Sequence, residues 1–135
     1  MIKSYVFLIL LFSSTFYAQK ERYPIFDACK DSDILSLKKC FYSSTRKHFV
    51  TAFKKLSTVE NKVFKGTANI IFAVTSEGEF KLVFLETTHK ELREVIKIIF
   101  KGFPKITPAW YNDHSIEMKF EFPVEFPLIE NSLSF

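Results

Sequence analysis

Three histidines, His48, His89 and His114, are the side chains of this chain best suited to acid–base catalysis or metal binding. Each is alone on its own segment, so a metal site would have to be assembled entirely by the fold. The triplet Asp113-His114-Ser115 contains the residue types of a catalytic triad, but adjacent residues cannot normally meet as acid, base and nucleophile. The sequence therefore predicts a non-catalytic protein with no metal or cofactor. A small hydrolase that uses His114 is the remote alternative.

The glycines and the charges argue against two other kinds of binding site. Gly66, Gly78 and Gly102 are isolated, so there is no glycine-rich loop to hold a phosphate. The formal net charge of +4 arises from interspersed Lys and Glu, whereas a nucleic-acid surface needs basic residues gathered on one face. No nucleic acid is expected as a partner. The 135 residues, 47% hydrophobic and 25% charged, suit one globular domain with a short extension.

The N-terminus is typical of a secretory signal peptide over residues 1–18. Lys3 makes its start positive, residues 5–12 form an unbroken apolar run, and small residues lead to Ala18. We expect cleavage between Ala18 and Gln19 and a mature protein in the periplasm. The alternative is an uncleaved segment that tethers the protein to the inner membrane, and only then is a membrane a partner. The apolar run is shorter than the roughly 20 residues of a membrane-spanning helix.

Cys29 and Cys40 are the only cysteines of the chain. In an oxidising compartment a single pair favours a disulfide. Free or metal-bound thiols are the alternative, but no histidine lies near enough in sequence to complete a zinc site.

The hydrophobic pattern of the first half predicts a helix and then a hairpin. Asp31, Ser32 and Asp33 are good N-cap residues for the helix, in which a break near Ser43-Ser44 is an alternative. Beyond the helix the apolar residues change from helical spacing to runs rich in strand formers. The expected elements are an extended lead-in over 19–33, an amphipathic helix over 34–56, a polar connector over 57–66, and strands 67–75 and 79–87 joined by a turn at 76–78.

The second half predicts one more helix and one more strand. Thr88 and Glu91 form a capping box, and the apolar residues that follow trace one helical face until Gly102 and Pro104. Strict alternation of apolar and charged residues then indicates a half-buried strand, which prolines end. The expected elements are a helix over 89–103, a loop over 105–114, and a strand over 115–122 closed by Pro123 and Pro127.

This order predicts an α+β fold in which a three-stranded antiparallel sheet packs on the second helix, with an additional N-terminal helix. A hairpin followed by a helical crossover places the last strand beside the first, which becomes central. The last strand is then an edge, in agreement with proline at its end. The expected divisions are an N-terminal extension over 19–64, a domain over 65–128, and a tail over 129–135.

Several motifs between Gly66 and Phe126 carry a family resemblance. A strand ends in a polar-polar-Gly turn and returns at once (NIIFAVTSEGEF), and the helix ELREVIKIIFKGF precedes Pro104 and the step Pro108-Ala109. The last strand reads SIEMKFEFPVEF. Together these motifs resemble the C-terminal domain of the energy transducer TonB. The upstream segment that begins YPIFDAC is similar to the cysteine-containing extension of some exported members.

The resemblance implies a binding function. The TonB domain captures an extended segment of an outer-membrane receptor at the edge of its sheet, by strand addition. A solvated edge blunted by charged side chains is the alternative from the residues alone. Trp110 and Tyr111 suit either a partner contact or packing over the end of the sheet. The partner-binding residues implied are Ser115, Ile116, Glu117, Met118, Lys119, Phe120 and Glu121, with Trp110 and Tyr111 beside them.

Departures from the family pattern narrow this function. Complete transducers have a transmembrane helix and a long proline-rich spacer, whereas this chain has five prolines and none is clustered. We therefore expect a soluble or tethered module whose partner is a TonB-dependent receptor or another envelope protein. A homodimer through the edge strand is a further expectation. The alternative is an exported assembly or regulatory protein that has a TonB-like fold and no role in energy transduction.

Overall fold

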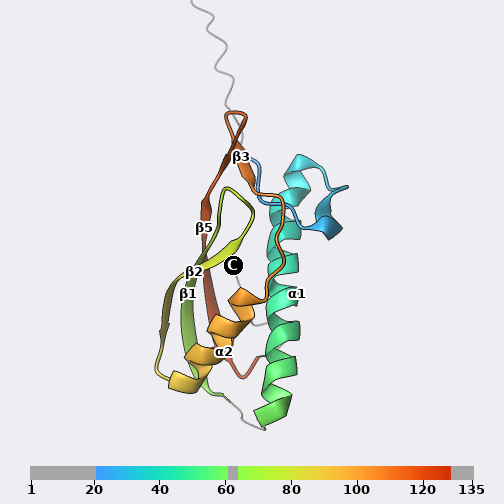
Figure 1. Ribbon diagram of the computed structural model, residues 1–135. Helices are drawn as coiled ribbons and strands as arrows, with labels where there is room; N and C mark the ends of the chain where they lie inside the picture. Colours follow the sequence, from blue (N-terminus) through green and yellow to red (C-terminus); the bar gives the residue numbers. More distant parts are fainter. Residues whose placement is uncertain (1–20, 61–63, 129–135) are drawn as a thin grey trace, which may run out of the picture.

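The computed structural model describes residues 21–60 and 64–128 of the chain, and these form the expected α+β fold. The two α-helices of these ranges lie on one side of a narrow sheet, and a small hairpin lies beyond the end of that sheet (Figure 1). None of the helices in the described residues is long and apolar enough to cross a membrane. The predicted signal peptide, its Ala18–Gln19 cleavage point and the tail lie outside these residues. The elements are η2 (Asp27–Cys29), α1 (Ile34–Glu60), β1 (Gly66–Val74), β2 (Phe80–Thr87), α2 (Lys90–Lys101), β3 (Ala109–Tyr111), β4 (His114–Ile116) and β5 (Met118–Phe126).

The main sheet has the strand order β2-β1-β5, and β1 is antiparallel to both of its neighbours. The expectation of a central first strand is therefore confirmed. The crossover α2 packs on β2 and contacts α1, so both helices form a layer over one face of the sheet (Figure 1). Among the residues that the structure describes, β2 and β5 are the two edges of the sheet, because each of them pairs only with β1.

The core between the layers consists largely of phenylalanine rings. The buried residues of α1 recur every fourth position, from Leu37 through Phe41 and Phe49 to Phe53, which is the spacing of one helical face. Three pairs of rings connect α1 to β5. Their centroids lie 4.5 Å apart for Phe41 and Phe120, 5.1 Å apart for Phe49 and Phe122, and 5.0 Å apart for Phe53 and Phe126. These three contacts hold α1 along the inner face of β5.

Helix α1 is continuous, so the alternative of a break near Ser43-Ser44 is wrong. Asp33 begins the helix as expected, because its Oδ1 accepts a hydrogen bond from the Ser36 amide at 2.8 Å. Inside the helix, the buried Thr45 hydroxyl donates to the Phe41 carbonyl at 2.9 Å. That bond satisfies a polar group that would otherwise interrupt the apolar face.

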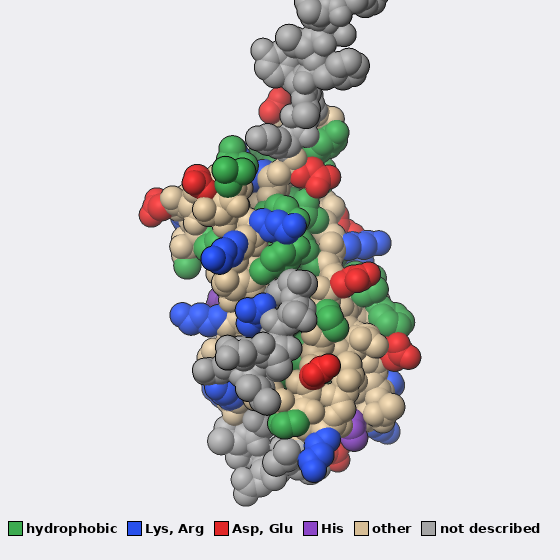
Figure 2. Space-filling view, turned by 180° about the vertical axis from the view of Figure 1, so that it is seen from behind, with side chains coloured by type: hydrophobic (Ala, Val, Ile, Leu, Met, Phe, Trp, Pro, Cys, Tyr) green, Lys and Arg blue, Asp and Glu red, His purple; other side chains and the backbone are tan. Residues whose placement is uncertain are grey.

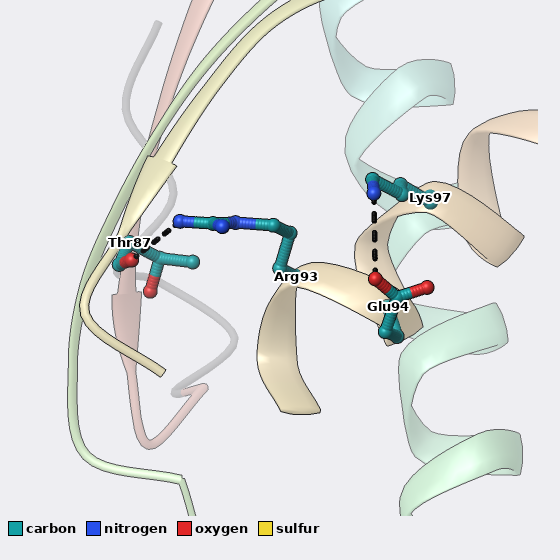
Figure 3. Close-up of polar contacts among 4 residues, drawn as sticks. All are labelled: Thr87, Arg93, Glu94 and Lys97. Carbon is teal, nitrogen blue, oxygen red and sulfur yellow. Dashed lines mark hydrogen bonds and ion pairs between the residues drawn. The ribbon is translucent and has the colours of Figure 1, made fainter. Parts of the chain in front are cut away.

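Helix α2 begins differently from the prediction. Its N-cap is His89, with no side-chain cap hydrogen bond, so the prediction that Thr88 caps the helix is wrong. The start of the helix is instead tied to the end of β2. The Thr87 hydroxyl accepts a bond from the His89 amide at 3.4 Å. Arg93 donates from Nη2 to the Thr87 carbonyl at 3.3 Å (Figure 3). One turn on, Lys97 forms an exposed ion pair with Glu94 at 3.3 Å (Figure 3).

A bulge in β2 changes which side chains face the core. Phe72 pairs with Leu82 while its neighbour Ile71 pairs with Phe84, so β2 contains one extra residue, Val83, at this point. The extra residue reverses the alternation, and Phe84 lies on the face away from the helices, 47% exposed. Strict alternation along the sequence predicts that Phe80, Leu82 and Phe84 share one face, and this prediction is therefore wrong for Phe84.

The predicted loop over residues 105–114 contains a strand, because β3 and β4 form a second two-stranded sheet. Their two-residue connection, Asn112-Asp113, has φ values of 52° and 60°. Two consecutive positive φ values define the type I′ turn that suits short hairpins, and Asn and Asp tolerate this conformation better than other non-glycine residues.

Two contacts fix segments that lie around the main sheet. Cys29 and Cys40 form a disulfide, as expected, with a Cα–Cα distance of 5.9 Å, and it joins η2 to the first turns of α1. In the β1–β2 turn, Gly78 has a φ of +85° and its carbonyl accepts a bond from the Ile106 amide at 3.0 Å. A Cβ atom at Gly78 would lie 1.8 Å from the Ile106 oxygen, so only glycine allows this approach.

Candidate functional site: the free edge of the sheet

The residues predicted as one continuous edge strand lie on two strands. Ser115 and Ile116 belong to β4 and pair with β3, while Glu117 lies between β4 and β5. Met118, Lys119, Phe120 and Glu121 are the first part of β5, which continues to Phe126. The expected boundaries of 115–122 are therefore wrong at both ends, and the longer edge is the one that β5 provides.

Strand β5 pairs with β1 along all of its nine residues, from Met118 opposite Val74 to Phe126 opposite Gly66. Within the described ranges, 21–60 and 64–128, no strand pairs with its other side. Even-numbered side chains from Phe120 onward are buried against α1, and odd-numbered ones are exposed. The backbone of an entire strand is thus held in register on one side only.

Pro123 lies inside β5, opposite Asn69, although the sequence placed it after the strand. A proline fits within a strand when its nitrogen points away from the neighbouring strand, because it has no N–H to donate. Backbone groups alternate in direction along a strand, so the amides of Lys119, Glu121 and Glu125 point to the same side as the Pro123 nitrogen. These three amides face the free edge.

A hollow of about 210 Å³ lies beside this edge, on the face of the sheet opposite the helices. Its apolar walls are Ile71, Phe84 and Pro123, and Asn69 and Glu121 supply its polar atoms. Sequence reasoning missed this hollow because the bulge in β2 exposes Phe84. The signal that could have revealed it is the run Leu82-Val83-Phe84-Leu85, which has apolar residues on both faces of the strand.

Trp110 and Tyr111 lie on β3, not on the main sheet, and are 41% and 39% exposed. The backbone of Trp110 is held on both sides. It pairs with Ser115 of β4 and exchanges hydrogen bonds of 2.9 and 3.0 Å with Arg22 of the lead-in. The side chains of Trp110 and Tyr111 are therefore available for contact, while the main chain of Trp110 is already paired.

An aromatic cluster lies near the start of β5. Tyr42 of α1 packs edge-on against Phe120, with ring centroids 6.2 Å apart, and against Tyr23, 5.9 Å apart. The Lys38 ammonium lies 5.8 Å from the Tyr23 ring and 6.0 Å from the Tyr42 ring. Burial, together with a hydrogen bond with Tyr23, raises the pKa of Tyr42 to about 12.

The three histidines do not come together. His48 lies on α1, where it stacks on Phe26 at 5.3 Å, while His89 caps α2 and His114 begins β4. The described part of the chain contains no group of three residues able to hold a metal ion. Asp113 is a turn residue and Ser115 pairs with Trp110, so the triplet is spread along a hairpin.

The described residues thus form an α+β module in which a three-stranded antiparallel sheet is covered on one face by two helices. Figure 2 shows the molecule from the side opposite to that of Figure 1, with basic and acidic side chains interspersed over this face. No protein-family model, curated protein or solved structure matches this chain.

Proposed function

We propose that the protein is a periplasmic, TonB-like binding module that captures an extended segment of an outer-membrane receptor by strand addition to β5. One observation carries the proposal: β5 has nine residues in continuous register with β1, and its opposite edge carries no partner strand within the described residues. The order strand, strand, helix, strand, with the last strand beside the first, is what the resemblance leads one to expect. It supports the proposal at the level of architecture.

The edge offers an added strand both hydrogen bonds and a place for a side chain. The amides of Lys119, Glu121 and Glu125 are donors for a partner backbone, and hydrogen bonds of this kind provide affinity in strand addition. Alternate side chains of the added strand would lie on the face away from the helices, next to the hollow between Phe84 and Pro123. An apolar side chain in this hollow would bury exposed apolar surface, so the site would prefer segments that have an apolar residue at that position.

The test is a binding experiment with two variants at one position. Lys119→Pro removes one edge amide, whereas Lys119→Ala removes only the side chain. The protein is incubated with an outer-membrane extract and carries a photo-crosslinking residue at Glu121. We expect the wild type and Lys119→Ala to crosslink to one extended segment of a receptor, and Lys119→Pro to lose most of this signal. Equal crosslinking by all three proteins, with Lys119→Pro still folded, contradicts strand addition.

Two other outcomes point to different functions. If no receptor crosslinks, an exported assembly or regulatory protein with the same fold becomes the better explanation. If the crosslinked partner is a second copy of the chain, the edge forms a homodimer. Amide hydrogen exchange provides an independent check, because an added strand protects Lys119, Glu121 and Glu125 and leaves the β1–β5 amides as they were.

A further inference from the structure

The face of the sheet opposite the helices has a charge pattern that the strand register fixes. The exposed, odd-numbered side chains of β5 point to this face, and the β1 residues opposite them are all uncharged. Ala73 of β1 lies opposite Lys119 of β5 on one side and Lys81 of β2 on the other. The row across the sheet at the start of β5 therefore carries two lysines.

The next three rows, toward the end of β5, each carry one glutamate on the same face. They are Glu121 of β5, then Glu86 of β2, then Glu125 of β5. Just outside the paired rows, Glu117 precedes β5 and Lys65 precedes β1. Along its paired length, the free edge of β5 is thus basic at Lys119 and acidic from Glu121 to Glu125.

These charges are available to a strand that is added beside β5. Lys119, Glu121 and Glu125 are exposed and form no ion pair with any residue in the described ranges. Side chains on neighbouring strands that point to the same face lie about 4.5 to 5.5 Å apart, where opposite charges attract and like charges repel. Charges that blunt an edge against unspecific pairing can therefore also select a strand of complementary charge.

The position between the two glutamates of β5 favours an apolar neighbour instead. Pro123 has no N–H to offer an added strand, so the attraction at this position has to come from side-chain contact. Its ring, with Ile71 and Phe84, forms the apolar walls of the hollow beside the edge. A long apolar side chain opposite Pro123 would pack on the ring at the rim of this hollow.

We propose that the edge of β5 selects a segment that reads basic-x-apolar-x-basic, where x is a residue that points to the helical side. The two basic side chains lie beside Glu121 and Glu125, and the apolar one lies beside Pro123. This inference rests on strand addition at β5 and specifies which segment is captured. The pattern reads the same in both chain directions, so it holds for a parallel or an antiparallel strand.

The first test varies the charges of a peptide. Three labelled synthetic peptides, nine residues long like β5, have a central leucine flanked at each second position by lysine, glutamine or glutamate, with threonine elsewhere. Their affinity for the full chain is measured by fluorescence anisotropy. Each opposite-charge pair should tighten binding about twofold to fivefold, so lysine should exceed glutamine about fourfold to twenty-five-fold. Equal affinity of the lysine and glutamine peptides overturns the proposal.

Matched double variants test whether the glutamates of the edge cause this preference. Glu121→Lys with Glu125→Lys reverses the charge of the edge, whereas Glu77→Lys with Glu94→Lys makes the same change of net charge in the β1–β2 turn and on α2. We expect the edge variant to prefer the glutamate peptide over the lysine peptide, and the control variant to keep the preference of the wild type. A reversed preference is not explained by damage to the fold. Equal effects of the two double variants overturn the proposal.

An acidic residue in the peptide tests the register at Lys119. Placed two residues beyond a basic residue, it lies opposite Lys119 only when it precedes the motif in a parallel strand or follows it in an antiparallel one. It should therefore tighten binding about twofold to fivefold at one end of the peptide and not at the other. Lys119→Ala should remove this gain. Equal gains at both ends contradict the register.

The backbone at Lys119 separates a failure of this inference from a failure of strand addition. We expect the lysine peptide to bind Lys119→Ala and to lose most of its affinity for Lys119→Pro. If all three peptides bind equally and only Lys119→Pro abolishes binding, strand addition stands and the charge pattern is overturned. If Lys119→Pro binds the lysine peptide as the wild type does, both are contradicted for this ligand. If no peptide binds, the pattern is insufficient and the inference falls, while crosslinking to a receptor still decides the proposed function.

Discussion

Proline substitutions on β5 offer a direct test of which backbone groups face the free edge. We compare Lys119→Pro with Lys119→Ala, and Val124→Pro with Val124→Ala, so that each difference isolates the backbone from the side chain. The Lys119 amide points to the same side of β5 as the Pro123 nitrogen, toward the free edge. The amide of Val124, which pairs with Ala68, points to the other side, toward β1. This arrangement predicts that proline is tolerated at Lys119 and not at Val124.

The two expected magnitudes follow from the hydrogen bonds at stake. At Lys119 the lost amide faces solvent, so proline should lower the free energy of unfolding by less than about 1 kcal/mol relative to alanine. At Val124, which is fully buried, proline removes a ladder hydrogen bond and leaves the β1 acceptor without its donor. That loss costs about 2 to 4 kcal/mol relative to alanine.

The assay is equilibrium urea denaturation followed by far-UV circular dichroism, with the disulfide intact in all four variants. The assigned amide directions are refuted if the Lys119 pair differs by as much as the Val124 pair. In that case the odd-numbered amides point toward β1, and Lys119→Pro does not test strand addition, because it removes a hydrogen bond within the sheet. A small difference for both pairs would show that β5 contributes little to the ladder under these conditions.

Three further predictions concern stability. Replacing both Cys29 and Cys40 by serine opens a loop with a sequence separation of 11, and should lower the free energy of unfolding by about 3 kcal/mol in chemical denaturation. Gly78→Ala should lower the free energy of unfolding by at least about 2 kcal/mol, because the new Cβ meets the Ile106 oxygen and φ is positive. Gly102→Ala should lower it far less, and equal effects of the two substitutions would contradict this account. Hydrogen bonds from Ser36 lower the pKa of Asp33 below its ordinary value of 3.8, so its stabilisation is present above that pH and lost as the pH falls through the lower pKa of the folded protein. Asp33→Ala should therefore have a lower thermal midpoint than the wild type at neutral pH, and the two midpoints should converge in acid.

Much of the fold could be predicted because its periodic patterns are strong. The apolar spacing of α2 and the strand formers on both sides of Gly78 determine a hairpin followed by a crossover, and chirality then leaves one simple position for the last strand. The prediction was wrong where a single residue changes the pattern. Val83 inserts a bulge that no periodicity reveals, and Asn112-Asp113 makes a type I′ turn without the glycine that usually marks one.

The candidate site could be predicted only in part for a related reason. Alternation from Met118 to Glu121 identifies the strand, but its ends depend on tertiary pairing. Pro123 can remain in β5 because its nitrogen faces the open side, a fact that requires knowledge of which strand lies beside it. The two hollows that His48 lines could not be predicted at all, since their walls come from α1, α2 and the loop after α2 and meet only in three dimensions.

The bridges between the lead-in and the loop after α2 have a mechanical consequence if the N-terminus is held. Arg22 and Ile25 are joined to Trp110 and Thr107 by four backbone hydrogen bonds of 2.9 to 3.1 Å. Tension applied at residue 21 therefore reaches these bonds first, and then the disulfide at Cys29, which does not extend further. A load applied along β5 instead acts in shear on the whole β1–β5 ladder. The lead-in, held by four backbone hydrogen bonds, would therefore be released at a lower force than the nine-residue β1–β5 ladder.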